Sequence, residues 1–338
     1  MNHRQEEQLP GVLAIDAGNS KTDVALVSAD GTVLGSARGG GFQPQLDGAE
    51  QAVDGLGPLV EEAALQAGLR PGTPFTTHVS ACLANADLPI EEQRLQAAIE
   101  ARRWGLTGHV ANDTFGLLRA GTDGPRGVAV VCGAGINCVG LLPDGRTARF
   151  PALGHLTGDW GGGGGLAAEA MWHATRAEDG RGGPTALAGA IARHFGLPSA
   201  TAVAETMHLG GLDRGRLHEI VRVLFAAAEA GDRTSLDLVD RQADEIARLA
   251  VVALTRLGLL GEPTPVVLGG GVLAARHPLL IDNLTARLAA AAPLAETRIV
   301  VAPPVLGAAL LGLDHLGAGP EIQHRLRAAY PTTTPVAA

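Results

Sequence analysis

Apolar residues occur along this chain in short runs separated by turns and by amphipathic segments. Two runs, at 12–16 and 22–27, flank a turn through Gly18, and a second turn ending at Gly31 leads to a third run at 32–37. Short apolar runs bounded by Gly and Asp are typical of β-strands, and connections this short require neighbouring strands to be antiparallel. The pattern therefore predicts three consecutive antiparallel strands.

In the next part of the chain, segments whose apolar residues have helical spacing alternate with segments typical of β-strands. Apolar positions close to a 3.6-residue spacing predict helices at 47–68 and 90–104. The segment FTTHVSACLA at 75–84 predicts a buried strand between them, and LTGHVAN at 106–112 predicts another strand, which ends at Asp113. Three strands followed by helix, strand, helix and strand indicate the α/β class.

Residues 127–149 repeat the layout of the first three strands: an apolar run, a turn containing glycine, another apolar run and an Asp-Gly turn. Asp144-Gly145 follows Asp30-Gly31 by 114 positions. Such a repeat predicts two similar lobes, each presenting one glycine turn to a shared cleft. We call residues 18–22 the first glycine turn and residues 133–135 the second glycine turn. Hairpins are common, so chance similarity is the alternative interpretation.

The second half of the chain contains additional helical pattern, which predicts a helical insert. The predicted helices are 166–176, 185–195, 216–229 and 236–260, followed by a strand at 264–271, a helix at 278–291, a strand at 297–304 and a helix at 305–315. We predict a small N-terminal α/β lobe over 1–118, a large α/β lobe over 119–318 and a tail over 319–338. Whether the tail folds back on the small lobe is left open, and its end, PTTTPVAA, is expected to fray.

Composition narrows the range of partners. Hydrophobic residues make up 46% of the chain, so both lobes can bury a core. A net charge of −9 argues against nucleic acid or an anionic membrane as a partner, because both attract basic surfaces. Three cysteines without a CxxC pair support neither a disulfide framework nor a zinc ribbon. The polar N-terminus lacks a signal-peptide core, and we expect a soluble cytoplasmic protein.

The glycine turns are candidates for phosphate binding. A glycine turn leaves backbone N–H groups unshielded, and Thr22 adds a hydroxyl donor. Asp16, at the carboxyl end of its strand, could hold a metal ion through water. An ordinary hairpin is the simpler interpretation of either turn alone. The chain has no GxxxxGK[ST], and Gly18 leads into a strand instead of a helix, which excludes a P-loop and a dinucleotide fingerprint.

Four stretches carry a resemblance to the sugar kinase/Hsp70/actin superfamily, and within it to the BadF/BadG family, which includes N-acetylglucosamine kinases. They are "DAGNSKT" at 16–22, "CGAGINC" at 132–138, "GHLTGD" at 154–159 and "VVLGGGV" at 266–272. They resemble, in the family's order, the two phosphate motifs, the sugar loop and the adenosine turn. The resemblance implies a two-lobed, actin-like (ribonuclease H-like) ATPase fold with duplicated βββαβαβα lobes.

Carried over residue by residue, the resemblance implies that ATP and Mg²⁺ are the cofactors, with Asp16 at the metal. The residues implied for ATP are Gly18, Asn19, Ser20, Lys21, Thr22, Gly133, Ala134, Gly135, Gly269, Gly270 and Gly271. For the last three, a plain strand-to-helix turn is nearly as good an interpretation.

The resemblance also implies the sugar site. Asp113 resembles the catalytic base that accepts a proton from the sugar's 6-hydroxyl, while Asn112 would fix a neighbouring hydroxyl. Helix capping is the alternative role for Asp113, and both can hold at once. The other implied sugar ligands are Asp159, His155, Gly135, Asn137 and Gln43.

The chain departs from the family pattern in places that bear on the substrate. Ala134 and Ile136 replace hydroxyl-bearing residues of the second phosphate motif, so backbone amides must supply that contact. Trp160 replaces a glutamate, and the five glycines that follow, 161–165, predict a loop that is mobile or shaped for a different sugar contact.

The resemblance implies a homodimeric kinase acting on N-acetylglucosamine, with glucosamine as the alternative acceptor. The same family contains ATPase activators of radical dehydratases or reductases, which hold an iron–sulfur cluster between subunits. Cys132 and Cys138 flank the second glycine turn, which is a poor position for cluster ligands. A sugar sensor without turnover is a third alternative, and Asp16, Asp113 and Asp159 argue against it.

Overall fold

The computed structural model describes residue 9, residues 11–70 and residues 74–330, and the predicted fraying of 331–338 lies outside these ranges. The chain divides into two compact units, each formed by more than one stretch of chain. Unit 1 comprises Met1–Ala129, Val139–Pro151 and Val300–Ala338, and unit 2 comprises Val130–Cys138 and Ala152–Ile299. No helix among the described residues is both long and apolar enough to cross a membrane.

Two five-stranded sheets have the same strand order, which confirms the predicted duplication and the α/β class. The first has the order β3-β2-β1-β4-β5 and the second the order β10-β9-β6-β7-β8, so that the first strand of each set is central. The strands are β1 (Val12–Ala17), β2 (Thr22–Val27), β3 (Val33–Gly39), β4 (Thr76–Leu83), β5 (Gly105–Asn112), β6 (Gly127–Cys132), β7 (Ile136–Leu141), β8 (Thr147–Arg149), β9 (Thr264–Gly269) and β10 (Ala295–Ile299).

Strand direction follows the lengths of the connections. The β1–β2–β3 ladder is antiparallel, as predicted, while β4 runs parallel to β1 and β5 parallel to β4. The two Asp-Gly turns are alike in detail: Gly31 and Gly145 have φ of +87° and +86°. In each turn the carboxylate of Asp30 or Asp144 accepts a hydrogen bond from the backbone N–H two residues on, at 3.1 and 3.0 Å. Both turns therefore use the same local chemistry.

Five helices belong to the first α/β set: α1 (Pro44–Asp47), α2 (Ala49–Asp54), α3 (Gly57–Gln66), α4 (Pro89–Arg102) and α5 (Asp113–Ala120). The single helix predicted at 47–68 was wrong, because it is broken between α2 and α3. Pro58 lies in the first turn of α3, where its missing N–H costs nothing, whereas inside a continuous helix it would remove a hydrogen bond.

The remaining helices are α6 (Gly162–Glu178), α7 (Leu187–Phe195), α8 (Ala200–His208), α9 (Ile220–Glu229), α10 (Arg233–Leu257), α11 (Gly271–Ala274), α12 (Pro278–Ala291), α13 (Pro304–His315) and α14 (Pro320–Ala328), with short 3₁₀ turns at Gly154–Leu156 and Arg214–Glu219. The periodicity analysis missed α8, α11 and α14. Most of the rest begin or end within a few residues of the predicted bounds.

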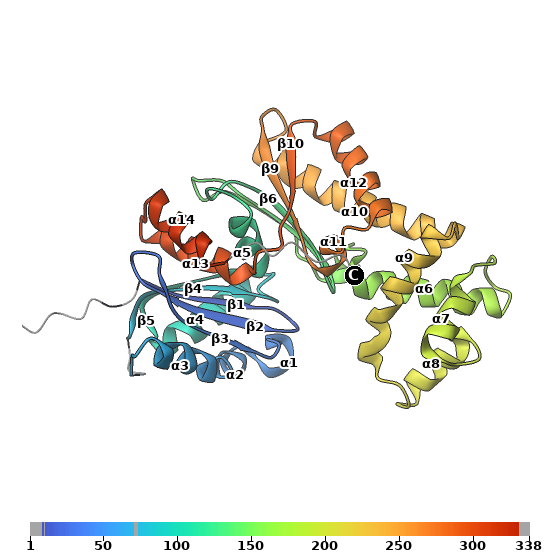
Figure 1. Cartoon of the computed structure of the whole chain (residues 1–338), viewed down its shortest axis with the longest axis horizontal. Helices are drawn as coiled ribbons and strands as arrows, with labels where there is room; N and C mark the ends of the chain where they lie inside the picture. Colours follow the sequence, from blue (N-terminus) through green and yellow to red (C-terminus); the bar gives the residue numbers. More distant parts are fainter. Residues whose placement is uncertain (1–8, 10, 71–73, 331–338) are drawn as a thin grey trace, which may run out of the picture. The chain divides into compact units, whose positions relative to one another are not determined.

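The first sheet is covered on both faces, as Figure 1 shows with α13 on one side and α2 and α3 on the other. Alternate residues of β1 enter different cores: Leu13 and Ile15 pack with α2, α3 and α4, whereas Val12 and Ala14 pack with α13. A strand buried on both faces reads as a continuous apolar run, which is the pattern seen in the sequence.

Helix α14 is tied to α5 through buried polar contacts. Arg119, fully buried, pairs with Asp314 of α13 at 2.6 Å and donates to the Gln323 side chain at 2.6 Å. Arg327 of α14 donates to the carbonyl oxygens of Arg119 and Ala120, at 3.1 and 2.8 Å, at the end of α5. A cation near a helix C-terminus satisfies carbonyls that have no partner within the helix.

Helices α5 and α13 cross at two glycines. A Cβ built on Gly307 would lie 1.6 Å from the carbonyl oxygen of Gly116, which is backbone and cannot move aside cheaply. We expect Gly307→Ala to destabilise the protein by roughly 3 kcal/mol, the upper part of the usual overpacking range. Thermal unfolding followed by circular dichroism measures this. Gly57→Ala, where a Cβ meets nothing within 4 Å, is the control, and equal melting temperatures would contradict the prediction.

Candidate active site

The first glycine turn is held in shape by backbone hydrogen bonds in unit 1. The N–H of Gly18 donates to the carbonyl of Lys21 at 2.9 Å, and the N–H of Phe42 donates to the carbonyl of Gly18 at 2.9 Å. Gly41 passes so close that a Cβ there would lie 2.1 Å from the carbonyl oxygen of Asn19. The segment after β3 thus forms a wall of the turn, which the sequence did not indicate.

We expect Gly41→Ala to displace the first glycine turn and to raise the KM for ATP about tenfold, corresponding to about 1.4 kcal/mol. The cause is the contact with the backbone of Asn19, since the side chain added is only a methyl group. Gly40→Ala is a matched control, because a Cβ at Gly40 meets nothing within 4 Å. Steady-state kinetics with ATP varied would show the difference, and identical constants for both variants would contradict it.

Asp16 is a buried carboxylate that accepts no hydrogen bond from any described residue. The negative charge of its cross-strand neighbour Asp23, by contrast, is compensated by two cationic side chains. The two are paired in register on β1 and β2, and each is 6% exposed. Asp23 binds Arg38 at 2.5 Å and lies 3.8 Å from the ammonium of Lys21. Burial, together with the charges of Asp113 and Asp23, raises the pKa of Asp16 well above its usual range. Such a carboxylate gains most from a bound cation.

The surroundings of Asp16 fit Mg²⁺ better than a transition metal. Mg²⁺ keeps several water ligands and binds through one or two carboxylates together with substrate phosphates. The described residues contain no cluster of three or more His, Cys, Asp or Glu side chains that could hold a metal alone. Asp16 is the residue that would hold such an ion, which would supply positive charge to the phosphates of ATP.

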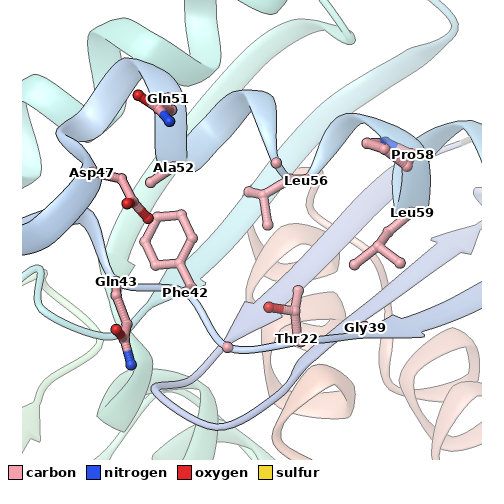
Figure 2. Close-up of a pocket in the computed structure, with 13 residues that line it drawn as sticks. Thr22, Gly39, Phe42, Gln43, Asp47, Gln51, Ala52, Leu56, Pro58 and Leu59 are labelled. Carbon is pink, nitrogen blue, oxygen red and sulfur yellow. The ribbon is translucent and has the colours of Figure 1, made fainter.

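Thr22 lies on the other face of the sheet from Asp16. Its register partner, Ala17, belongs to the core beneath α2 and α3, as do the alternate β2 residues Val24 and Leu26. Thr22 lines a cavity of about 300 Å³ there, and Figure 2 shows its side chain facing Leu56 and Leu59. Other residues that line this cavity are Gly39, Gly40, Gly41, Phe42, Gln43, Asp47, Gln51, Ala52, Gly55 and Pro58. Gln43 and Thr22 are thus brought together, away from Asp16.

Asn112 and Asp113 occupy the junction between β5 and α5. Asn112 is the N-cap: its Oδ1 accepts from the N–H of Thr114 at 3.0 Å, and its Nδ2 donates to Asp87 at 2.9 Å. The capping role considered for Asp113 therefore belongs to Asn112. Asp113 is the first residue of α5, and burial raises its pKa to about 6, although hydrogen bonding to the Thr114 backbone opposes the shift.

Asp87 also belongs to the site around Asn112 and Asp113, and the sequence analysis missed it. It lies just before α4, and burial, followed by the charges of Asp113 and Glu91, raises its pKa to about 7, while Arg149 opposes the shift. Asp87 precedes a Leu-Pro pair, which looks like ordinary helix-start chemistry, so only its contact with Asn112 reveals it.

In unit 2, the second glycine turn docks onto the start of α6. Gly163 and Gly164 donate their N–H groups to the carbonyls of Gly133 and Ala134, at 2.7 and 2.8 Å. In a trans peptide the C=O of one residue and the N–H of the next point in opposite directions. The N–H groups of Ala134 and Gly135 therefore point away from α6. This arrangement suits an anion on the side opposite the helix.

The five glycines do not form the mobile loop considered from the sequence, because 162–165 are the first turn of α6. Gly162 has φ of +70°, and a Cβ there would lie 2.5 Å from the carbonyl carbon of Gly135. Its N–H donates to Oε1 of the fully buried Gln242 at 2.9 Å. Glycine is needed here for close backbone approach.

Trp160 is directed into the protein. The ring is 5% exposed, its Nε1–H donates to Glu169 at 3.2 Å, and the guanidinium carbon of Arg241 lies 4.0 Å from the ring centroid. Its contacts are therefore with α6 and α10, and they account for a tryptophan at this position.

The turn at Gly269–Gly271 packs against the second glycine turn. Gly270 has φ of +88°, and a Cβ there would lie 2.5 Å from the carbonyl carbon of Cys132 and 2.7 Å from the N of Gly133. The structure thus brings together the two glycine segments assigned from the sequence to phosphate and to adenosine. This is a stronger reason for glycine than a simple strand-to-helix turn.

The predicted sugar loop of unit 2 closes on itself. The N–H of Asp159 donates to the carbonyl of Gly154 at 3.0 Å, and the Thr157 hydroxyl donates to the Asp159 carboxylate. His155 is exposed within the 3₁₀ turn. Asn137 lies on β7, where its Oδ1 accepts from the N–H of Cys138 at 2.7 Å.

Two sheets of identical strand order, each with a glycine turn after its central strand, define an ATPase of the actin-like class. Within that class the chain belongs to the BadF/BadG/BcrA/BcrD ATPase family, whose model matches residues 13–312. ATP is accordingly the nucleotide of this chain.

Curated relatives and a solved structure agree with this assignment. The chain is 26% identical, over 78% of its length and 85% of the relative, to an N-acetylmuramic acid/N-acetylglucosamine kinase of Clostridium acetobutylicum. It is 29% identical, over 61% of its length, to an N-acetyl-D-glucosamine kinase of Dictyostelium discoideum, of which it spans 65%. A proposed N-acetylglucosamine kinase of Chromobacterium violaceum shares the fold, with a TM-score of 0.68, 23% identity, and coverage of 89% of this chain and 98% of that one.

Proposed function

We propose that this protein is an ATP-dependent kinase that phosphorylates an amino sugar at its 6-hydroxyl, with N-acetylglucosamine as the first acceptor and glucosamine as the alternative. The observation that carries the proposal is Asp113, a half-buried carboxylate at the start of α5 with its pKa raised to about 6 by desolvation, in the same unit as Asp16 and the first glycine turn. The activities named for the two curated relatives support the choice of acceptor.

In the proposed reaction the 6-hydroxyl oxygen attacks the γ-phosphorus of ATP while Asp113 accepts the hydroxyl proton. A new P–O bond forms to the sugar, the bond to the β-phosphate oxygen breaks, and ADP leaves. Phosphoryl transfer depends mainly on positioning and charge stabilisation. Backbone N–H groups of Ala134 and Gly135 would donate to phosphate oxygens in place of the missing hydroxyls. Mg²⁺, when bound near Asp16, would neutralise charge on the triphosphate.

The acceptor is proposed to contact Asp159, His155 and Asn137 from unit 2. Carboxylate and amide groups of this kind exchange hydrogen bonds with ring hydroxyls. Gln43 is the candidate from unit 1, although its position at the cavity under α2 separates it from Asp16. These assignments rest on the family pattern.

The cysteines give little support to the activator alternative. Cys82, Cys132 and Cys138 are all free and buried. Burial raises the pKa of Cys132 to about 12 and the pKa of Cys138 still further, whereas cluster ligands are thiolates. Absence of iron in the protein purified without oxygen is the expected result.

The proposed function is tested by coupling ADP release to a panel of glucose, glucosamine, N-acetylglucosamine, N-acetylmannosamine and N-acetylmuramate. We expect the highest kcat/KM with N-acetylglucosamine and a 6-phosphate product by ³¹P NMR. ATP hydrolysis that no sugar stimulates would refute the kinase assignment. We also propose a homodimer, which sedimentation equilibrium of the full chain measures directly.

A further inference from the structure

The Asn112 carboxamide is clamped from two sides. Its Oδ1 accepts from the N–H of Thr114 at 3.0 Å, and its Nδ2 donates to Oδ1 of Asp87 at 2.9 Å. Asn112 is 2% exposed, so its side chain is part of the protein interior. Its established contacts are with the backbone of α5 and with Asp87.

The Asp87 carboxylate fixes which way this amide faces. A carboxylate accepts hydrogen bonds, so it selects the orientation in which the NH₂ group points towards it. That orientation leaves the amide oxygen to cap α5, and capping by Asn is worth about 1 kcal/mol. The opposite orientation would set two oxygens against each other and leave the Thr114 N–H without an acceptor. The start of α5, where Asp113 lies, therefore depends on Asp87.

Charged side chains from several elements surround the Asp87 carboxylate. Asp113 on α5 and Glu91 on α4 repel its negative charge, while Arg149 on β8 attracts it. Arg149 also binds Glu92 at 2.6 Å and donates to the carbonyl of Ala86 at 2.9 Å. One arginine therefore anchors the backbone next to Asp87 to a strand of the other sheet.

We infer that Asp87 is a positioning residue for Asp113: its carboxylate orients the Asn112 carboxamide, which caps α5 and so fixes the base at the first position of that helix. The inference rests on the proposed role of Asp113 as the base. It replaces the role of Asn112 as a direct ligand of a sugar hydroxyl with a role inside the protein.

The test compares Asp87→Ala with Asp87→Asn. The alanine variant removes the acceptor of the Asn112 bond, and we expect kcat to fall about 10- to 100-fold, as for misplacement of a catalytic group by about 1 Å. The KM for ATP should stay unchanged, because ATP is held elsewhere. The asparagine variant keeps an amide oxygen as acceptor and should restore kcat to within about threefold. Rescue of this kind is not expected from a residue that only fills space.

A pH profile and a double-mutant cycle complete the test. The acid limb of kcat/KM should stay near pH 6 in Asp87→Asn, because Asp87, with a pKa of about 7, is already largely protonated where Asp113 titrates, so this variant tests position separately from charge. Asp87→Ala and Asn112→Ala should be non-additive, since they break the same hydrogen bond. Glu61→Ala, on the exposed side of α3, is the control for a changed acid far from the site.

Wild-type kcat in Asp87→Ala would overturn the inference, as would equal losses in Asp87→Ala and Asp87→Asn. Additive effects of Asp87→Ala and Asn112→Ala would also overturn it. None of these outcomes affects the kinase proposal, which fails if no sugar is phosphorylated, whereas wild-type turnover in Asp113→Asn would remove only Asp113 as the base. The two claims can therefore be rejected separately.

Discussion

Asp113→Asn is expected to lower kcat for sugar phosphorylation by ~10²–10⁴-fold, the usual contribution of a positioned general base. Asparagine has the same shape and can keep its place at the start of α5, so the sugar Kd should change little. Stopped-assay kinetics and calorimetric titration with the sugar separate the two quantities. Asp237→Asn, on an exposed part of α10, is the control. Wild-type turnover in Asp113→Asn would remove Asp113 as the base.

The same assignment has a pH signature. Burial raises the pKa of Asp113 to about 6, so the carboxylate form that accepts a proton is the major form only above that pH. kcat/KM for the sugar should therefore fall about tenfold per pH unit below about 6. With an aspartate of ordinary pKa as the base, kcat/KM would begin to fall only about two pH units lower. A flat profile down to pH 4.5 would contradict the predicted environment of Asp113.

Gly270→Ala is expected to weaken ATP binding by at least ~30-fold, corresponding to about 2 kcal/mol of strain. At φ of +88° an alanine is strained, and its Cβ would lie 2.5 Å from the backbone of Cys132. The second glycine turn, which begins at the next residue, must shift to make room. Calorimetry with a non-hydrolysable ATP analogue measures the loss.

Gly261→Ala is the matched control for this variant. It lies in the same unit, and a Cβ there meets nothing within 4 Å. Circular dichroism should confirm that both variants keep their helices, so that weaker binding reports the turn itself. Equal affinities of Gly270→Ala and the wild type would show that the two glycine segments do not support the nucleotide together.

Local patterns predicted most of the fold. The Asp30-Gly31 and Asp144-Gly145 turns could be recognised because their hydrogen bonds join residues only two to four positions apart. The antiparallel pairing of β1, β2 and β3 could be predicted as well, since connections this short leave no alternative, whereas the order of the other strands was not predicted. The break between α2 and α3 was missed because the apolar period continues across Pro58, and local backbone chemistry outweighed it.

Residues of the candidate site could be proposed from the sequence only where their position in a predicted element marks them. Asp16 and Asp113 stand at strand ends, which is visible in the sequence. The Asp87–Asn112 bond joins residues 25 positions apart, and no period links them. Gly270 approaches the backbone of Cys132, which is far away in the sequence. A run of glycines in a sequence does not indicate which other segment its backbone will contact.

Unit 1 is assembled from stretches that are far apart in the sequence. Val12, Ala14, Ala25 and Val27 face a core whose other side is supplied by α13 and α14. During synthesis these side chains are made about 280 residues before α13 and α14, which cover them. The growing chain must therefore carry an uncovered apolar sheet face until α13 and α14 have been made, and a product that stops before them would expose this face to aggregation.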